Sequence, residues 1–353
     1  MTSVAQPGRQ SLEPATEPAS APTFGRLVRV ELRRLRSRRF FLVLVGIGIL
    51  GYLVGLLFLA SRYDKVTPEA LARATATRDV QQQQNQEYYQ QCLTDPQRPA
   101  DTSVDSFCGP DPAGQQMEVR WFIDVRPFDA DQFQNLTIGV GVGVGLLALF
   151  LGATFIGAEW SSRNLVAWLF WEPRRLRLLA AKLTALLGVL LVLAVLAQVI
   201  WYVTGKILLA TKGIPVEQSD PPRPEFWTGL FEMQVRAALF VVPTALLGFG
   251  LANLMRNTAA TLGVALVYLL GVETLLASLN PHLVPFQFSS AAIAWFLPGG
   301  LHYPGDLVYN AEYQSMVPED LVFTNLQGGL VLLAYAAVVT IGSCWLFRRR
   351  DIS

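Results

Sequence analysis

Few side chains in this sequence of 353 residues have the types and spacing that chemistry requires. It contains three cysteines, Cys92, Cys108 and Cys344, and two histidines, His282 and His302, which lie far from them. That spacing fits no zinc pattern, and three cysteines are too few for a disulfide framework. We therefore expect no metal site.

Motifs that bind nucleotides or cleave bonds are also absent from the sequence. It has no G-x-x-x-x-G-K-[ST] phosphate loop, no H-E-x-x-H and no G-x-S-x-G. It also lacks a run of acids within apolar segments that would resemble a proton relay. The chain is expected to be no enzyme by itself and to bind no cofactor. Any energy source must then come from a partner or an ion gradient.

Segment 157–182 is the most informative polar stretch. Ser161 or Ser162 could cap a short helix that ends before Pro173. Two interpretations stay open: the helix fits a groove on a partner, or it lies in the membrane interface, where Trp is common. In either case it would display large apolar side chains, namely Leu165, Trp168, Leu169 and Trp171.

Two charged residues lie near the ends of apolar segments, where an unpaired charge is costly. Glu273 falls about two helical turns inside the end of one segment, and Arg236 lies at the start of another on the same side. We predict that they pair and stabilise an external gate. The alternative is that Glu273 faces a water-filled cavity or a backbone group.

Six long apolar segments must position these residues. Apolar residues make up 52% of the chain and charged residues only 16%, and about 20 helical residues cross a hydrocarbon core of roughly 30 Å. The expected fold is an all-α integral membrane protein with six transmembrane helices. The predicted spans are 40–60, 136–156, 183–203, 237–255, which Pro243 interrupts, 259–279 and 328–347.

The N-terminal part is predicted to stay on one side of the membrane. Residues 1–23 have no apolar core of a signal peptide, and their composition predicts a disordered cytoplasmic tail. Residues 24–39 hold seven arginines, Arg29, Arg33 and Arg36 among them, and a single apolar stripe. An amphipathic interfacial helix against anionic headgroups is favoured over a simple cluster of stop-transfer charges.

Two of the connecting segments are long. Segment 61–133 has twelve acidic and seven basic residues and is expected to form an extracytoplasmic domain. Segment 280–325 has no Lys or Arg, and is expected to be an extracytoplasmic loop. Within it, the apolar stretch 283–297 is too short to cross, which predicts a re-entrant or interfacial segment before the last span.

The distribution of charge predicts the orientation. Positive residues mark cytoplasmic loops, and six spans with both termini in the cytoplasm, including tail 348–353, satisfy every segment. This orientation puts Cys92 and Cys108 in one external segment, where an oxidising exterior favours a disulfide over two free thiols. Most Lys and Arg lie in 26–39, 163–182, Arg256 and 348–350, and they alternate with segments 61–133, 211–233 and 280–325.

Segment 157–182 resembles the first cytoplasmic loop of permease subunits of ABC-2-type ATP-binding cassette transporters. Arg163 and Asn164 replace the usual Gly-Thr of that family, and the large first external segment departs from its plainest members. The topology is similar as a whole, including the amphipathic N-terminal helix, the short turn at Arg256 and the re-entrant segment. The matching residues are Gly157, Glu159, Leu165, Pro173, Arg175 and Lys182.

The resemblance implies a permease that pairs with a second permease subunit, expected to be identical, and that binds two ATPase subunits. ATP and Mg²⁺ would bind to those ATPases. The substrate path would lie at the permease interface, with the first, second and fifth spans as walls. The expected location is the bacterial cytoplasmic (inner) membrane, with lipids but no nucleic acid as further partners. The residues implied in ATPase coupling are Glu159, Arg163, Leu165, Trp168, Leu169, Pro173 and Arg175.

Three functions stay open. The leading one is ATP-driven export, or extraction from the membrane, of an amphipathic drug, peptide or lipid. The second is a mechanotransmitter or maturation factor with the same ATPase coupling, which a folded, disulfide-closed external domain would favour. The third, a secondary transporter, requires buried ionisable groups near the membrane midplane, and the sequence has essentially none.

Overall fold

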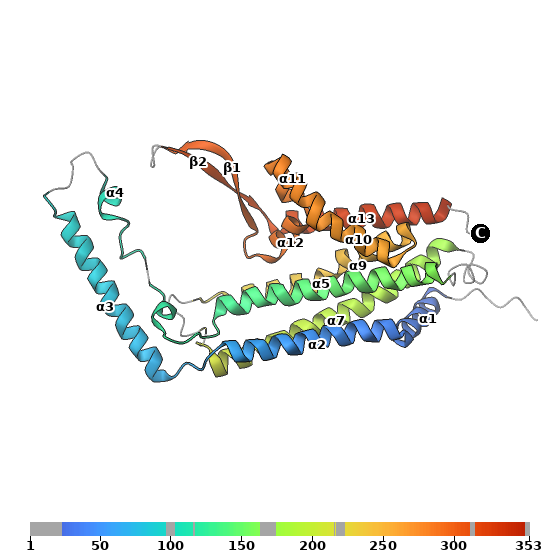
Figure 1. Ribbon diagram of the computed structural model, residues 1–353, viewed down its shortest axis with the longest axis horizontal. Coiled ribbons are helices and arrows are strands. Elements are labelled where there is room, and N and C mark those ends of the chain that lie inside the picture. Colours follow the sequence, from blue (N-terminus) through green and yellow to red (C-terminus); the bar gives the residue numbers. More distant parts are fainter. Residues whose placement is uncertain are drawn as a thin grey trace, which may run out of the picture.

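A computed structural model describes residues 23–96, 103–115, 117–162, 174–214, 216, 223–310 and 315–349. Six of its helices are long and apolar enough to cross a membrane, and they lie roughly along one direction as a bundle (Figure 1). The prediction of a six-span helical membrane protein is confirmed at this level. The six are α2 (Arg39–Arg62), α5 (Ala130–Ser161), α7 (Arg175–Lys212), α8–α9 (Phe226–Leu239 and Val241–Met255), α10–η3–α11 (Thr258–Leu279) and α13 (Asn325–Arg349).

Two of the spans are interrupted. The break between α8 and α9 falls at Phe240, three residues before Pro243, whose missing N–H removes the bond that would continue the helix. In the fifth span, five residues of π-helix (η3, Tyr268–Val272) separate α10 (Thr258–Val267) from α11 (Glu273–Leu279). A π-bulge of this kind re-aims the side chains that follow it.

The bundle is held together at its centre by close approach of α5 and α9. A Cβ atom at Gly248 would collide with the carbonyl oxygen of Leu149, and one at Gly152 would lie 2.6 Å from the carbonyl oxygen of Ala245. Small residues at such crossings let helix backbones pack tightly where lipid supplies no hydrophobic driving force. By contrast α2 has no buried residue, and the fifth span is almost as exposed.

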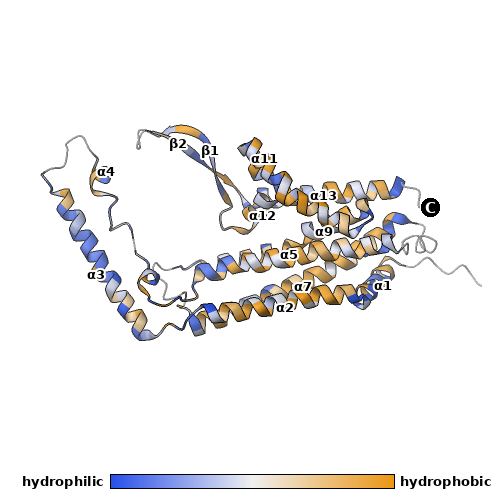
Figure 2. Ribbon diagram, viewed as in Figure 1, coloured by the Kyte–Doolittle hydropathy of each residue, from blue (hydrophilic) through white to orange (hydrophobic). Residues whose placement is uncertain are grey.

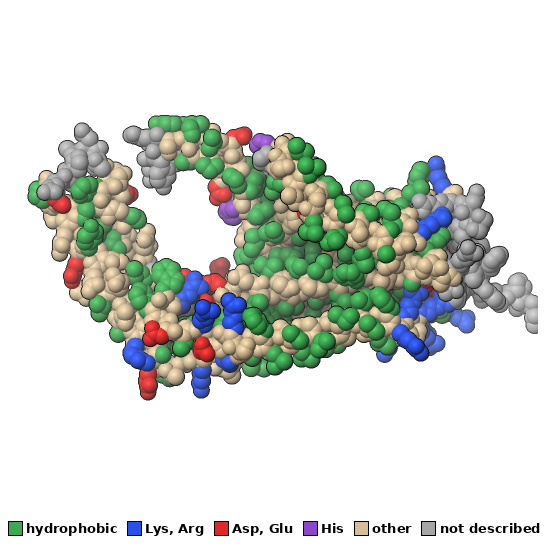
Figure 3. Space-filling model, viewed as in Figure 1, with side chains coloured by type: hydrophobic (Ala, Val, Ile, Leu, Met, Phe, Trp, Pro, Cys, Tyr) green, Lys and Arg blue, Asp and Glu red, His purple; other side chains and the backbone are tan. Residues whose placement is uncertain are grey.

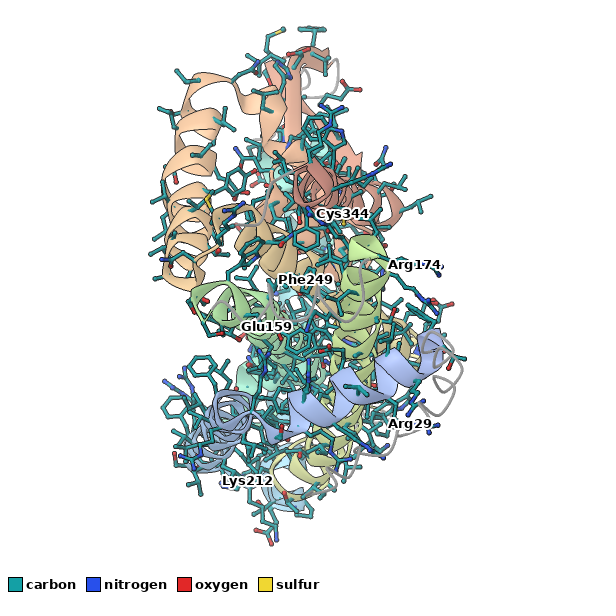
Figure 4. All side chains as sticks on the ribbon, turned by 90° about the vertical axis from the view of Figure 1, so that its right-hand side faces the viewer. Arg29, Glu159, Arg174, Lys212, Phe249 and Cys344 are labelled. Atoms are coloured by element: carbon teal, nitrogen blue, oxygen red, sulfur yellow. A yellow bond between two sulfur atoms is a disulfide. The ribbon has the colours of Figure 1, made fainter. Side chains whose placement is uncertain are left out.

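Helix α1 (Phe24–Ser37) precedes the first span and turns away from it at Arg38, whose backbone is extended. The predicted N-terminal amphipathic helix is therefore present. Its Leu35 is buried in the core of the bundle, and α1 packs across the start of α7. Figure 4 shows α1 crossing the end of the bundle.

The described part of segment 61–133 forms an arm that projects from the opposite end of the bundle (Figure 1). Its helix α3 (Pro68–Leu93) is mostly polar (Figure 2), and Ala74 is its one buried residue. A disulfide joins Cys92 at the end of α3 to Cys108 at the end of α4 (Val104–Cys108), which confirms that expectation. Among the described residues, α3 and α4 make no extensive contact with the helices of the bundle, and η1 (Val119–Phe122) lies at the base of the arm.

Segment 280–325 contains more structure than the sequence predicts. A short helix, α12 (Phe288–Phe296), follows η4 (Pro281–Phe286) and packs on the start of α13, where Asn325 Nδ2 donates to the carbonyls of Ala294 and Leu297. Strands β1 (Leu301–Asn310) and β2 (Ser315–Phe323) then form an antiparallel hairpin. The all-α expectation is wrong for this hairpin. The sequence did not predict it, because no Asn-Gly or Asp-Gly turn marks the hairpin. In Figure 3 the hairpin and the arm curve toward each other.

Candidate functional site

The most unusual feature of the bundle is a buried charge network at its arginine-rich end. Lys182 is fully buried, and its Nζ lies 2.8 Å from Glu31 Oε2 and 2.9 Å from Glu159 Oε2. Both carboxylates are almost completely buried as well. Burying charges is costly unless they are paired, so this trio depends on its mutual contacts.

Two arginines complete the network. Arg38 pairs with Glu159 and donates a hydrogen bond of 2.8 Å to the carbonyl of Phe155, and Arg34 Nη1 lies 3.2 Å from Glu31. The Phe155 ring lies beneath the cations: Arg38 Cζ is 4.9 Å and Lys182 Nζ is 5.4 Å from its centroid. Three cations thus surround two carboxylates, which leaves the network with a net positive charge.

Four parts of the chain supply these groups. Glu31 comes from α1, Arg38 from the junction of α1 and α2, Glu159 from the last turn of α5 and Lys182 from the second turn of α7. Residues 163–173, which connect α5 to α7, lie outside the described residues. The network therefore ties the end of α5 and the start of α7, on either side of that connection, to the N-terminal helix.

Only two of the predicted coupling residues belong to the described part of the chain. Glu159 is at the centre of the network, and Arg175 Nη1 donates to the carbonyl of Phe347 at 3.5 Å, which ties the start of α7 to the end of α13. On α1, the side chains named for membrane contact, Arg29, Arg33 and Arg36, are all exposed. The coupling residues that lie outside the described residues are Arg163, Leu165, Trp168, Leu169 and Pro173.

Sequence reasoning missed Glu31. It is the only acid among the seven arginines of residues 24–39, and it lies on the same face as buried Leu35, four residues later. A lone acid in such a basic, amphipathic helix signals a buried partner elsewhere. Lys182 was noted only as a match to the family, without its two carboxylate partners.

Comparison with protein-family models and with curated proteins finds no match for this chain. Its site must be interpreted from its own geometry. Among the described residues, no group of three or more His, Cys, Asp and Glu side chains is arranged to hold a metal ion.

The predicted pair of Arg236 and Glu273 is wrong. Glu273 is buried, but its Oε1 accepts a hydrogen bond of 3.2 Å from the backbone N–H of Ser289 in the first turn of α12. The N–H groups of that turn have no partner within their own helix, so they attract a carboxylate. Arg236 has Glu232 as its nearest acid, at 3.8 Å, and its Nε atom has no hydrogen-bond partner among the described residues. Of the alternatives that the sequence left open, the one in which Glu273 faces a backbone group agrees with the structure.

A second ion network lies at the base of the arm, at the opposite end of the bundle. Arg120 Nη1 lies 2.6 Å from Asp131 and 3.1 Å from Asp129, and Arg223 also binds Asp131. The hydrogen bond with Asp131 raises the pKa of the Arg223 guanidinium above its usual value. These groups are partly exposed and mixed in sign (Figure 3), which fits a clasp between the arm and the start of α8.

Proposed function

We propose that this chain is the permease subunit of an ATP-driven transporter of the ABC-2 type, with ATP hydrolysed by two separate subunits. The six apolar helices would form the membrane domain. Segment 157–182 would bind the ATPases, as its resemblance to the first cytoplasmic loop of such permeases implies. The cargo we propose is an amphipathic drug, peptide or lipid, moved out of the cytoplasmic membrane of a bacterium.

The observation that carries this proposal is the buried network of Glu31, Lys182 and Glu159. A force on the connection between α5 and α7 reaches α1 and the first span at once, because the network joins all of them. Packed protein interiors and interfaces tend to switch between discrete arrangements rather than deform gradually. That property suits the transmission of a nucleotide-driven movement.

The exposure of two spans supports the expected pairing of permeases. No residue of α2 is buried, and the fifth span is nearly as exposed, whereas α8–α9 is two-thirds buried. Tyr52 of α2 bonds Thr204 of α7 at 2.7 Å, so the helix is oriented despite its few contacts. A second copy that covers these spans would put them, with α5, along the substrate path.

Copurification tests the proposal. The chain, extracted from its native membranes with a mild detergent, should bring down an ATPase with a phosphate loop, and the reconstituted complex should hydrolyse ATP. Replacing Trp168 and Leu169 by Ala should abolish that association, while a double change to Ala at exposed Val195 and Leu196 of α7 should not. Absence of any ATPase from the preparation, with no stimulation when cognate ATPases are added, would reject the proposal.

A second candidate is a mechanotransmitter or maturation factor that uses the same ATPases without moving a solute. The disulfide-closed arm favours it, since α3 extends well beyond the bundle and offers a surface to an extracytoplasmic partner. Removal of the arm distinguishes the two. Transport that survives deletion of 68–116 supports the exporter, and loss of partner binding with ATPase activity intact supports the second candidate.

A further inference from the structure

A cavity of about 570 Å³ opens beside the buried charge network, between the start of α2, the last turns of α5 and the start of α10. Its size lies within the range of about 300–1,000 Å³ that is typical of small-ligand sites. Both α2 and α10 pack on α5, but they make no extensive contact with each other. The described helices therefore do not close the cavity completely.

The lining of the cavity changes character along the span. At the arginine-rich boundary it carries Arg38, Arg39 and the hydroxyl groups of Ser161 and Ser162. Deeper in the bundle its walls are apolar. The deeper residues are Phe41, Leu151 and Phe155. This sequence of surfaces, charged and then apolar, matches a phospholipid whose headgroup lies at the boundary and whose chains enter the core.

The charges of the rim favour an anionic headgroup. Arg39 is exposed and has no acidic partner among the described residues. Among the described residues, the one acid that lines the cavity is Glu159, which is almost completely buried and already forms ion pairs with Arg38 and Lys182, so it presents little charge to the ammonium group of a zwitterionic lipid. Basic pockets between transmembrane helices are known to bind anionic lipid headgroups.

We propose that this cavity binds one anionic phospholipid from the surrounding leaflet, with Arg39 as its main charged contact. The lipid would fill the gap between α2 and α10 next to the charge network. The inference does not depend on an ATPase partner or on the nature of the cargo.

Native mass spectrometry of the purified full chain, titrated with phosphatidylglycerol or with phosphatidylcholine of the same acyl chains, tests the proposal. The wild type should bind phosphatidylglycerol at least fivefold more tightly. Ala158→Phe, which fills the cavity from α5, should weaken that binding about tenfold. Ala180→Phe, at an exposed alanine of α7 outside the cavity, should leave it unchanged. Equal affinity for both lipids would overturn the proposal.

Two variants that each remove one positive charge provide a test that does not depend on how Ala158→Phe folds. Arg39→Gln should lower the preference for phosphatidylglycerol about fivefold, the factor expected for one basic residue near an anionic headgroup. Arg29→Gln removes the same charge from an exposed site on α1 and should change the preference less than twofold. If the two variants behave alike, the preference reflects the general charge of the surface and the cavity is not the site.

Discussion

Lys182 is buried in the protein interior, where two carboxylates from distant parts of the chain meet it. Each of the three side chains would be unstable without the others, since breaking a buried ion pair leaves an uncompensated charge. The network is therefore expected to stabilise the fold as well as to transmit movement. Removing one of its charges should destabilise the protein more than removing all three together.

Lys182→Met should lower the stability of the bundle by about 3–5 kcal/mol, because Glu31 and Glu159 would lose their shared partner. The triple variant with Glu31→Gln and Glu159→Gln should recover part of that loss. Thermal unfolding followed by tryptophan fluorescence in detergent measures both. Arg29→Gln, exposed on α1, should shift stability by less than about 0.5 kcal/mol. A melting temperature unchanged by Lys182→Met would show that the trio does not support the fold.

Glu273 and Arg236 offer a test of independence. Since each has its own partner, the effects of Glu273→Gln and Arg236→Gln on stability should add, with a coupling energy below about 0.5 kcal/mol. A double-mutant cycle of thermal unfolding measures this coupling. A value above about 1 kcal/mol would restore the direct pair that the sequence suggested.

At the scale of elements, the close contact between α5 and α9 depends on glycines that have no side chain to keep the two backbones apart. Gly248→Ala should destabilise the bundle by about 1–3 kcal/mol, because the new methyl group meets the backbone of α5 at Leu149. Gly188→Ala on α7 is the matched control. Nothing lies within 4 Å of a Cβ at Gly188, so the change should be neutral or stabilise by up to about 1 kcal/mol. Thermal unfolding of the two variants measures these effects, and equal unfolding temperatures would contradict the prediction.

The arm should behave as an element separate from the bundle. Reduction of the disulfide between Cys92 and Cys108 should increase proteolysis between α3 and α4 but leave the melting of the bundle unchanged, since α3 buries only Ala74. Limited proteolysis and thermal unfolding, each with and without reductant, measure these effects. A bundle that melts several degrees lower after reduction would mean that the arm supports it.

How well the sequence predicted each element depends on how local its signal is. All six spans follow from runs of apolar residues, and the break before Pro243 follows from the missing N–H of proline. The hairpin of β1 and β2 was missed, because its strands carry prolines and lack a recognisable turn. The partners of Glu31 could not be predicted, and a backbone partner for Glu273 was only one of several alternatives, because both depend on which helices pack together.

At the scale of the whole molecule, six spans require both ends of the chain to lie on one side of the membrane. Single cysteines introduced at Ser3 and Ser353 in a chain without native cysteines should react with an impermeant maleimide only after the membrane is opened. A cysteine at Gln84, in the middle of α3, should react in intact cells or right-side-out vesicles. Opposite labelling of Ser3 and Ser353 would exclude an even number of spans.

The hairpin has a consequence for how copies of this protein behave when they are crowded. A two-stranded sheet has two free edges, and such edges invite strands from neighbouring molecules to add on. Here Pro304 lies within β1 and Pro318 within β2, and the pairing is irregular between Pro304 and Leu307. Since proline cannot donate to a neighbouring strand, the hairpin is a poor template for polymerisation. We therefore expect the protein to expose these strands without strand addition between copies.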